Sequence, residues 1–188
     1  MFLLSEPEPM SNKMLYFIGV GCNIEPEVNV PAILSRLLED FGQISISRLC
    51  FTEPVGMKSD QLFVNFVVLL RSELEPAQIK SYCNKVEHDF GRDRSDPNRK
   101  HLDRRADLDI VYTCRHGHLQ QNDLLVDDIC DEQFLIPIFQ ELVDYLSNKT
   151  VQPAKHELLH CELGGSVVGQ MPTTINLEPG TRHVVVVQ

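Results

Sequence analysis

The sequence predicts an α+β fold in which two helices cover one face of an antiparallel sheet. Apolar residues recur at helical spacing in two segments, and four other segments have the apolar runs or the alternation of β-strands. Glycine or proline residues separate most of these segments. Their order along the chain is strand, helix, strand, strand, helix, strand, which is the β-α-β-β-α-β pattern of ferredoxin-like sandwiches.

The first half of this pattern begins with a buried strand, because Leu15 to Gly21 is a short apolar run that ends in glycine. Residues 30–41 place apolar side chains on one helix face and stop at Gly42, which predicts an amphipathic helix. Residues 44–49 alternate with period two and lead into a proline-containing loop, so we expect a second strand here.

The second half continues with a β-branched and aromatic strand at residues 63–70. Pro76 opens a helix that extends to about Phe90, just before Gly91. Asp107 to Thr113 forms the fourth strand of the predicted sandwich.

The chain divides into three parts on this pattern. We expect a disordered lead-in over residues 1–13, one domain over residues 14–148 and a C-terminal extension over residues 149–188, helical in part and packed on or trailing from the domain. A helix at residues 134–146 would pack on the sandwich. The apolar run at residues 184–187 predicts either an added edge strand or a frayed tail.

Composition indicates an ordinary globular protein with a small anionic ligand. The chain has 188 residues, of which 43% are hydrophobic and 23% charged, and this length suits one domain with a real core. Its formal net charge of −10 argues against a nucleic-acid surface. The only dense basic cluster runs from Arg92 to Arg105, and one cationic loop on an acidic protein suits a small anion.

The six cysteines are scattered without C-x-x-C spacing, and no secretory segment precedes them, so we expect reduced thiols in the cytoplasm. The longest apolar runs, such as residues 63–70, are too short to cross a bilayer, and no membrane role is expected.

Asp107 and Asp109 stand at alternate positions of the predicted fourth strand, so both carboxylates point the same way. Like charges at this spacing repel, and a cation between them relieves the repulsion. Mg²⁺ is often held by one or two carboxylates together with phosphates, so the pair predicts a magnesium site. The alternative is that these charges only protect a strand edge, beside a solvated loop.

Four short motifs follow one another in the predicted frame. They are Gly21-Cys22-Asn23, Thr52-Glu53-Pro54-Val55-Gly56, Phe63-Val64-Asn65 and the Arg-x-x-Asp-Leu-Asp-Ile signature from Arg104 to Ile110. In their order and spacing they resemble the 6-hydroxymethyl-7,8-dihydropterin pyrophosphokinase (HPPK) family of folate biosynthesis. The likeness covers residues 15–112 and continues more faintly to residue 146, so the chain is identified as a divergent member of this family.

The resemblance implies transfer of the terminal pyrophosphoryl group of ATP to the hydroxymethyl oxygen of the pterin, with release of AMP and with two Mg²⁺ ions. The partners are then small molecules, and we expect a monomer or a weak homodimer. Asp107 and Asp109 match the metal ligands of the family, and Arg92 and Arg104 match its phosphate-contacting, catalytic arginines. The candidates for ATP contacts are Glu87, Arg94 and Arg99; for Glu87 a solvated helix face is the alternative.

The pterin site that the resemblance implies has a stacking aromatic ring, an asparagine, a loop that lends backbone groups and a second aromatic ring. Asn65 lies within an apolar run, and a buried amide without partners costs about 1 to 3 kcal/mol, so it bonds either backbone or ligand. The candidate pterin residues are Phe63, Asn65, Thr52, Val55, Gly56 and Phe134.

The chain departs from the family pattern in an aromatic residue and in cationic residues. It has no tryptophan, whereas the catalytic loop of the family usually holds one. Asp127-Asp128 stands where the family has a Pro-His pair, and Asp131 to Gln133 stands where it has an arginine. A working but divergent enzyme is the first hypothesis, and a paralogue that binds pterin or nucleotide without turnover is the second.

A competing motif is His156-Glu157-Leu158-Leu159-His160, which fits the H-E-x-x-H pattern. On a helix it would place two imidazoles one turn apart for Zn²⁺, with Glu157 as general base of a zinc hydrolase. Pro153 and the glycines at 164 and 165 confine any such helix to about ten residues. The zinc hydrolase is therefore a remote alternative.

Overall fold

The computed structural model describes residues 13–97, 101–115, 124–178, 180 and 183–187. The predicted lead-in lies outside the described residues, except for residue 13. Along the chain the elements are β1 (Met14–Cys22), α1 (Pro26–Phe41), β2 (Gln43–Ile46), β3 (Cys50–Thr52), β4 (Phe63–Ser72), α2 (Pro76–Asp89), β5 (Asp107–Arg115), a short 3-10 helix η1 (Val126–Asp128), α4 (Ile136–Leu146), β6 (Cys161–Leu163), β7 (Ser166–Val168), β8 (Thr173–Leu177) and β9 (Val184–Val187).

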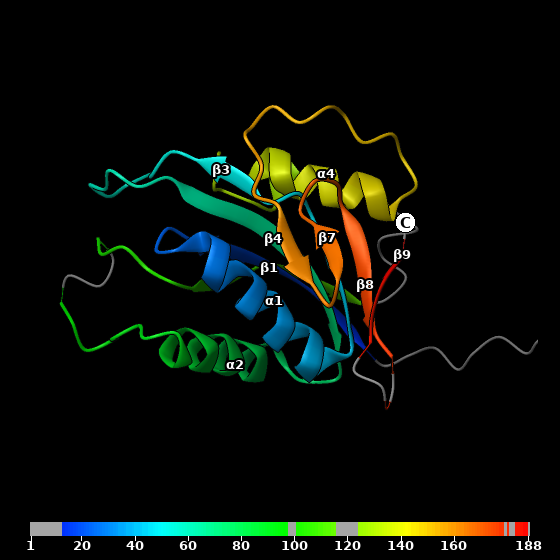
Figure 1. The fold of residues 1–188 in the computed structure, drawn as a ribbon, viewed down its shortest axis with the longest axis horizontal. Helices are drawn as coiled ribbons and strands as arrows, with labels where there is room; N and C mark the ends of the chain where they lie inside the picture. Colours follow the sequence, from blue (N-terminus) through cyan, green and yellow to red (C-terminus); the bar gives the residue numbers. More distant parts are fainter. Residues whose placement is uncertain (1–12, 98–100, 116–123, 179, 181–182, 188) are drawn as a thin grey trace, which may run out of the picture.

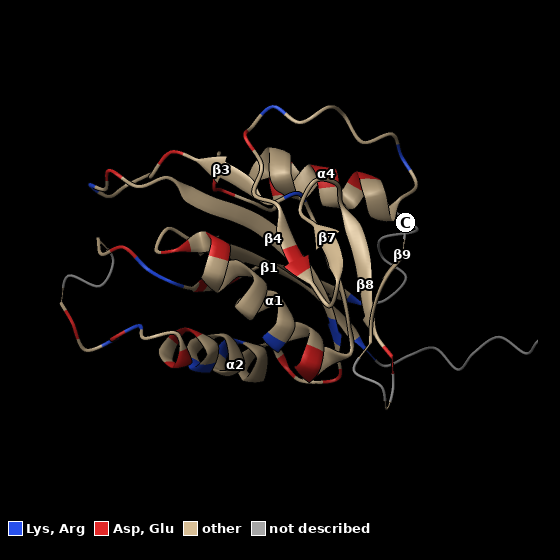
Figure 2. Cartoon of the chain, viewed as in Figure 1, with Lys and Arg blue, Asp and Glu red and all other residues tan. Residues whose placement is uncertain are grey.

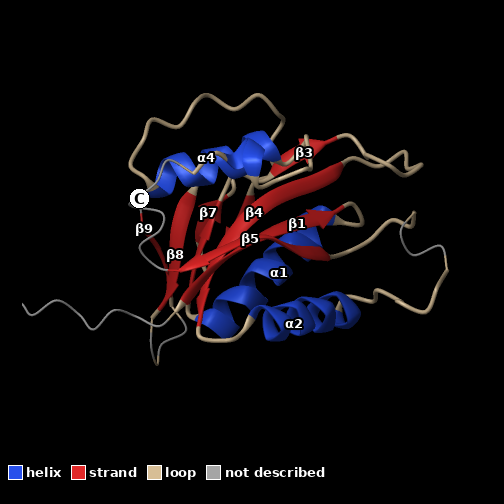
Figure 3. Cartoon of the chain, turned by 180° about the vertical axis from the view of Figure 1, so that it is seen from behind, coloured by secondary structure: helices blue, strands red, loops and turns tan. Residues whose placement is uncertain are grey.

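Seven of these strands form one antiparallel sheet. Its order is β5-β1-β4-β2-β8-β9. The seventh strand, β3, pairs with residues 63–65 of β4, and β2 pairs with residues 68–70 of the same strand. Helices α1 and α2 lie on one face of the sheet and α4 lies on the opposite face (Figure 1, Figure 3). The prediction of a mixed fold with a mostly antiparallel sheet is confirmed, and the described part of the chain contains the three predicted helices as α1, α2 and α4.

The sheet separates two hydrophobic cores, one on each face. Tyr16 and Ile18 belong to the core under α1 and α2, whereas Leu15 and Phe17 belong to the core under α4. Because successive side chains of a strand point to opposite faces, a central strand between two helical layers must be apolar at almost every position. This explains why β1 is a continuous apolar run, and Phe17 packs on Phe139 of α4 with 4.9 Å between ring centroids.

The expected helical character of the C-terminal extension is wrong. Residues 149–188 contribute strands: β6 and β7 form a small hairpin, β8 pairs with β2, and β9 pairs with β8. The run at 184–187 is therefore an edge strand, the first of its two predicted forms. Strand pairing with β2 could not be read locally, because its partner lies about 130 residues away in sequence.

The H-E-x-x-H segment is extended in the structure, so it lacks the helix that the zinc motif requires. The Leu159 N–H donates to the carbonyl of Leu49 and the Phe51 N–H donates to the carbonyl of Glu157, at 2.8 Å each. On an extended chain His156 and His160 do not stack one turn apart, which is what the zinc motif requires. Within the described ranges, no group of three or more His, Cys, Asp or Glu side chains could hold a metal ion.

All six cysteines are buried and free. Burial raises the pKa of the Cys22 and Cys50 thiols to about 12, so both remain protonated near neutral pH. Among the described residues, no helix is long and apolar enough to span a membrane. The described parts of the loop between α2 and β5 carry both basic and acidic residues (Figure 2).

Candidate active site

A cavity of about 250 Å³ opens where the C-terminal half of β1 meets the starts of β4 and β5. Antiparallel pairing brings these segments together, since Gly21 lies opposite both Asn65 and Asp107. The β3–β4 loop and the segment before α4 complete the walls. The lining residues are Gly19, Val20, Gly21, Glu53, Val55, Met57, Phe63, Asn65, Arg104, Asp107, Asp109, Val111, Glu132, Phe134 and Leu135.

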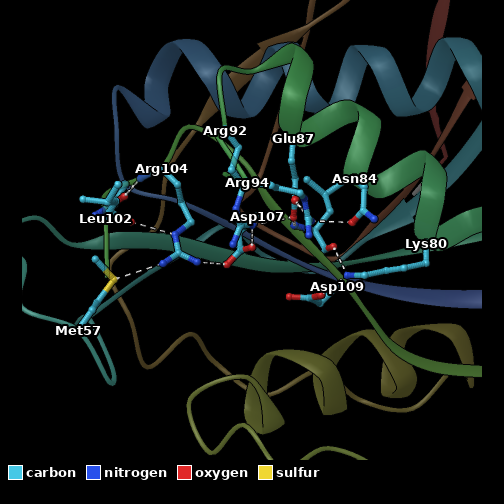
Figure 4. Close-up of polar contacts among 12 residues, drawn as sticks. Met57, Lys80, Asn84, Glu87, Arg92, Arg94, Leu102, Arg104, Asp107 and Asp109 are labelled. Atoms are coloured by element: carbon cyan, nitrogen blue, oxygen red, sulfur yellow. Dashed lines mark hydrogen bonds and ion pairs between the residues drawn. The ribbon is translucent and has the colours of Figure 1, made fainter. Parts of the chain in front are cut away.

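Asp107 is held between two guanidinium groups (Figure 4). Arg92 Nη1 donates to its Oδ1, and Arg104 Nη1 donates to its Oδ2 at 2.5 Å. Burial raises the pKa of the Asp107 carboxyl, but the positive charges of Arg104 and Arg92 together lower it by more. The resulting pKa lies below the ordinary value. Asp107 is therefore an anion that both predicted arginines reach, from the two ends of the loop between α2 and β5.

Glu87 is fully buried beneath this cluster, so the alternative of a solvated helix face is wrong. Its Oε1 accepts hydrogen bonds from Arg92 and from the backbone N–H of Leu108, both at 2.8 Å. Its Oε2 accepts one from Arg94, which also donates to Asn84 at 2.6 Å. In the structure, Glu87 thus supports Arg92 and the start of β5 from α2, and Arg94 of the following loop bonds the second oxygen of its carboxylate.

Asp109 follows Asp107 on the same face of β5, as predicted, and both line the cavity. The Nζ of Lys80, which projects from α2, lies 2.5 Å from Asp109 Oδ1 (Figure 4). The pair fits Mg²⁺, because two carboxylates face one cavity and this ion commonly takes its remaining ligands from phosphates and waters.

Asn23 is a site residue whose role the sequence did not reveal. Its Oδ1 accepts from the Arg104 N–H at 2.8 Å, and its own N–H donates to the Arg104 carbonyl at 3.0 Å. Its Nδ2 donates to Asp103 at 2.6 Å. These bonds fix the backbone of Arg104, and Asn23 is only 1% exposed. Its place in the Gly-Cys-Asn motif was the available signal.

The predicted pterin residues gather around the same cavity, with two exceptions. Phe63, Asn65, Val55 and Phe134 line it, and the Arg104 guanidinium lies 5.9 Å from the Phe63 ring centroid. The two other predicted pterin residues lie outside the lining: Thr52, which accepts a 2.6 Å hydrogen bond from Asn65, and Gly56, which turns the loop with a φ of 72°.

Other site expectations have mixed outcomes. Arg99 lies outside the described residues. Asp127 and Asp128 form part of η1 and are exposed, while Glu132 lines the cavity. Lys80 was missed, although its spacing of seven residues from Glu87 places both on one helix face.

The comparisons with known proteins agree with this geometry. The family model described as 7,8-dihydro-6-hydroxymethylpterin-pyrophosphokinase (HPPK) matches residues 17–138. The chain belongs to the HPPK family. The HPPK match spans all the residues that line the cavity, from Gly19 to Leu135, whereas the strands β6 to β9 lie beyond it.

Curated relatives of this HPPK chain come from bacteria and a plant. A 2-amino-4-hydroxy-6-hydroxymethyldihydropteridine pyrophosphokinase of Porphyromonas gingivalis is 30% identical over 112 residues, which are 58% of this chain and 76% of that protein. An enzyme of the same name from Campylobacter jejuni is 33% identical over 105 residues, 54% of this chain and 65% of that protein. A folate synthesis bifunctional protein of Arabidopsis thaliana is 26% identical over 142 residues, 73% of this chain and 28% of that protein.

Proposed function

We propose that this HPPK chain transfers the pyrophosphoryl group of ATP to 6-hydroxymethyl-7,8-dihydropterin, releasing AMP, in folate biosynthesis. The observation that carries the proposal is the single cavity that joins the carboxylate pair Asp107 and Asp109 to Arg104, Phe63 and Asn65. An anion-binding end and an aromatic, amide-bearing end are what a phosphorylated donor and a flat heterocyclic acceptor require.

In this proposal Asp107 and Asp109 hold Mg²⁺, which supplies charge neutralisation on the phosphates when bound. Arg92 and Arg104 face the same carboxylate and present guanidinium forks that suit phosphate oxygens. Glu87 and Asn23 keep these arginines in place. Because no covalent enzyme intermediate is invoked, catalysis consists of positioning the reactants and stabilising charge.

At the other end of the cavity, Phe63 and Phe134 offer ring faces to the pterin and Asn65 offers its amide. The Nδ2 of Asn65 is bonded to Thr52, which fixes the orientation of the side chain. A fixed amide can hydrogen-bond the polar edge of a heterocycle at little cost in side-chain entropy.

Asn65→Ala should weaken pterin affinity at least tenfold while nucleotide affinity changes little. Calorimetric titration of each ligand checks this, and equal losses would place Asn65 in the fold alone.

The second candidate is a pterin- or nucleotide-binding paralogue without turnover. The observation that favours it is the number of acidic side chains around the cavity. Glu53 and Glu132 line the cavity together with the aspartate pair, and Asp127 and Asp128 lie in η1. Carboxylates repel phosphate unless a cation intervenes, and each lost charge-assisted bond removes about 1.5 to 3 kcal/mol.

The deciding experiment measures AMP released from ATP and Mg²⁺, with and without 6-hydroxymethyl-7,8-dihydropterin, for the wild type and for Asp107→Ala. Pterin-dependent AMP that is lost in the variant supports the pyrophosphokinase. Ligand binding without AMP supports the paralogue, and absence of both refutes both candidates. A cytoplasmic location and a monomeric or weakly dimeric state remain part of the proposal, supported for location by the six free cysteines.

A further inference from the structure

A polar row on α2 faces the acidic start of β5. Lys80, Asn84 and Glu87 stand at i, i+4 and i+7, so they share one face of the helix (Figure 4). Glu87 and Asn84 are occupied with arginines of the following loop. Lys80 alone of this row reaches Asp109, with its Nζ at 2.5 Å from Oδ1 and 3.5 Å from the carbonyl of Leu108.

Both carboxylates of the aspartate pair therefore have protein cations as partners. Asp107 contacts the guanidinium groups of Arg92 and Arg104, and Asp109 contacts the ammonium group of Lys80. A divalent ion that approaches this pair meets three positive charges and must compete with them for the carboxylate oxygens.

The Lys80 contact is the one of these that exchanges most readily. The side chains of Lys80 and Asp109 are 41% and 68% exposed, whereas those of Arg92 and Arg104 are 16% and 12% exposed. Exposed ion pairs are weak, and an ammonium group is a compact point charge on a flexible stem. Lys80 can thus neutralise Asp109 and still leave without disrupting packed structure.

We propose that Lys80 is a positioning residue for Asp109, and that its ammonium group lowers the affinity of the aspartate pair for a divalent cation until nucleotide is present. The inference rests on the metal site of the proposed function. Nucleotide phosphates add ligands for the cation and give the displaced lysine and arginines anionic partners. The site therefore favours the metal–nucleotide complex over the free metal ion.

The test measures Mn²⁺ affinity of the full chain without nucleotide, from the electron paramagnetic resonance signal of free Mn²⁺. Lys80→Met should bind Mn²⁺ about three- to tenfold more tightly than the wild type, because a competing and repelling charge is removed. Lys80→Arg retains the charge and should stay within about twofold of the wild type. Lys85→Met, on the same helix but outside the polar row, should also match the wild type and is the control for loss of a positive charge.

An affinity of Lys80→Met equal to or weaker than that of the wild type overturns the inference, as does an increase of the same size in Lys85→Met. Pterin-dependent AMP release together with an unresponsive Lys80→Met would reject the role of Lys80 and leave the proposed function standing. A tighter Lys80→Met without AMP release in the wild type would support Lys80 at the aspartate pair and reject turnover.

Discussion

At the scale of single residues, Gly21 leaves open space at the asparagine end of the cavity. A Cβ atom at this position would lie 2.9 Å from Asn65 Oδ1 and 3.5 Å from Phe63 Cδ1. Gly21 is not among the residues with positive φ, so alanine is compatible with the backbone and the effect is one of side-chain space.

Gly21→Ala is therefore expected to push the Asn65 amide aside and to weaken pterin binding about tenfold, or about 1.4 kcal/mol. Nucleotide affinity should stay within about twofold, because the added methyl group lies at the asparagine end of the cavity. Calorimetric titration with each ligand measures both. A variant that loses nucleotide affinity as strongly as pterin affinity would contradict this assignment of the two ends.

Glu87 shows how a buried charge can serve a site that it does not touch. Glu87→Gln keeps an oxygen for the Leu108 N–H but removes the anion that faces Arg92 and Arg94. We expect the free energy of unfolding to fall by about 1 to 3 kcal/mol and nucleotide affinity to fall with it. Urea unfolding and calorimetry measure the two effects. Glu39→Gln, an exposed acid on α1, should change stability by less than about 0.5 kcal/mol, and an equal loss there would contradict the argument.

The sequence predicted the residues of the cavity better than their supporting contacts. The alternation of a strand was enough to place Asp107 and Asp109 on one face, because that relation is local. The hydrogen bonds of Asn23 to the Arg104 backbone, and the contacts of Glu87 with Arg92, depend on how the loop between α2 and β5 folds back toward the end of β1. No local sequence pattern encodes the path of this loop. Family resemblance pointed to Glu87, for which a solvated helix face was the alternative, although Glu87 stands four and eight residues after the buried Cys83 and Ile79 of the same helix.

At the scale of elements, Arg48 ties three segments together. It is 4% exposed and follows β2, and its guanidinium donates to Glu141 of α4 at 2.7 Å. It also donates to the carbonyls of Gln152 and Gln170 at 2.8 and 2.9 Å. Removing one partner of a buried pair leaves an uncompensated charge, so Arg48→Ala should cost about 3 to 5 kcal/mol in urea unfolding. A loss below about 1 kcal/mol would mean that water replaces the guanidinium.

The partner Glu141 should respond to pH in the direction opposite to a surface ion pair. Burial raises the pKa of its carboxyl, and the bonds from Arg48 lower it by less, so the pKa of the folded protein lies above the ordinary value. A raised pKa contributes stability that is full below the unfolded pKa and is lost as pH rises through the folded pKa. The stability of the wild type relative to Glu141→Gln should therefore decline between pH 4 and pH 7. Urea unfolding of both proteins at these two pH values measures it, and a rising difference would contradict it.

The helices α1, α2 and α4 and the strands β1, β2, β4 and β5 were predictable because their signals are periodic or continuous within short windows. Residues 30–41 and 63–70 were placed close to α1 and β4 for this reason. Strand β8 and the extended segment at 157–161 were not, since short strands have few residues and owe their form to distant partners. The same reason explains why the segment 156–160 is extended, although its H-E-x-x-H pattern would need a helix to bind zinc: the chain there pairs with residues 49–51.

At the scale of the whole molecule, the C-terminal strands belong to the same sheet as the cavity. β8 lies between β2 and β9, and Ile175 stands opposite Ile44 in the core under α1. Tyr145 of α4 also accepts a hydrogen bond from the Thr174 N–H at 3.1 Å, so both layers contact this strand. We therefore predict that residues 149–188 unfold together with residues 14–148 rather than as a separate extension.

Ile175→Ala tests this prediction. Because Ile175 is fully buried, its truncation leaves a cavity between sheet and helix and should lower the free energy of unfolding by about 2 to 5 kcal/mol. Val187→Ala, at a position 44% exposed on β9, should lower the free energy of unfolding by well under about 1 kcal/mol and is the control.

If the C-terminal strands form one cooperative unit with the rest, unfolding of Ile175→Ala followed by circular dichroism and by tyrosine fluorescence gives coincident single transitions at lower urea. Two separated transitions, or a wild-type midpoint with only local loss of amide protection in β8 and β9, would show instead that the C-terminal strands are an independent layer. In that case the cavity, which the segment from Gly19 to Leu135 lines without them, should keep its ligand affinities in the variant.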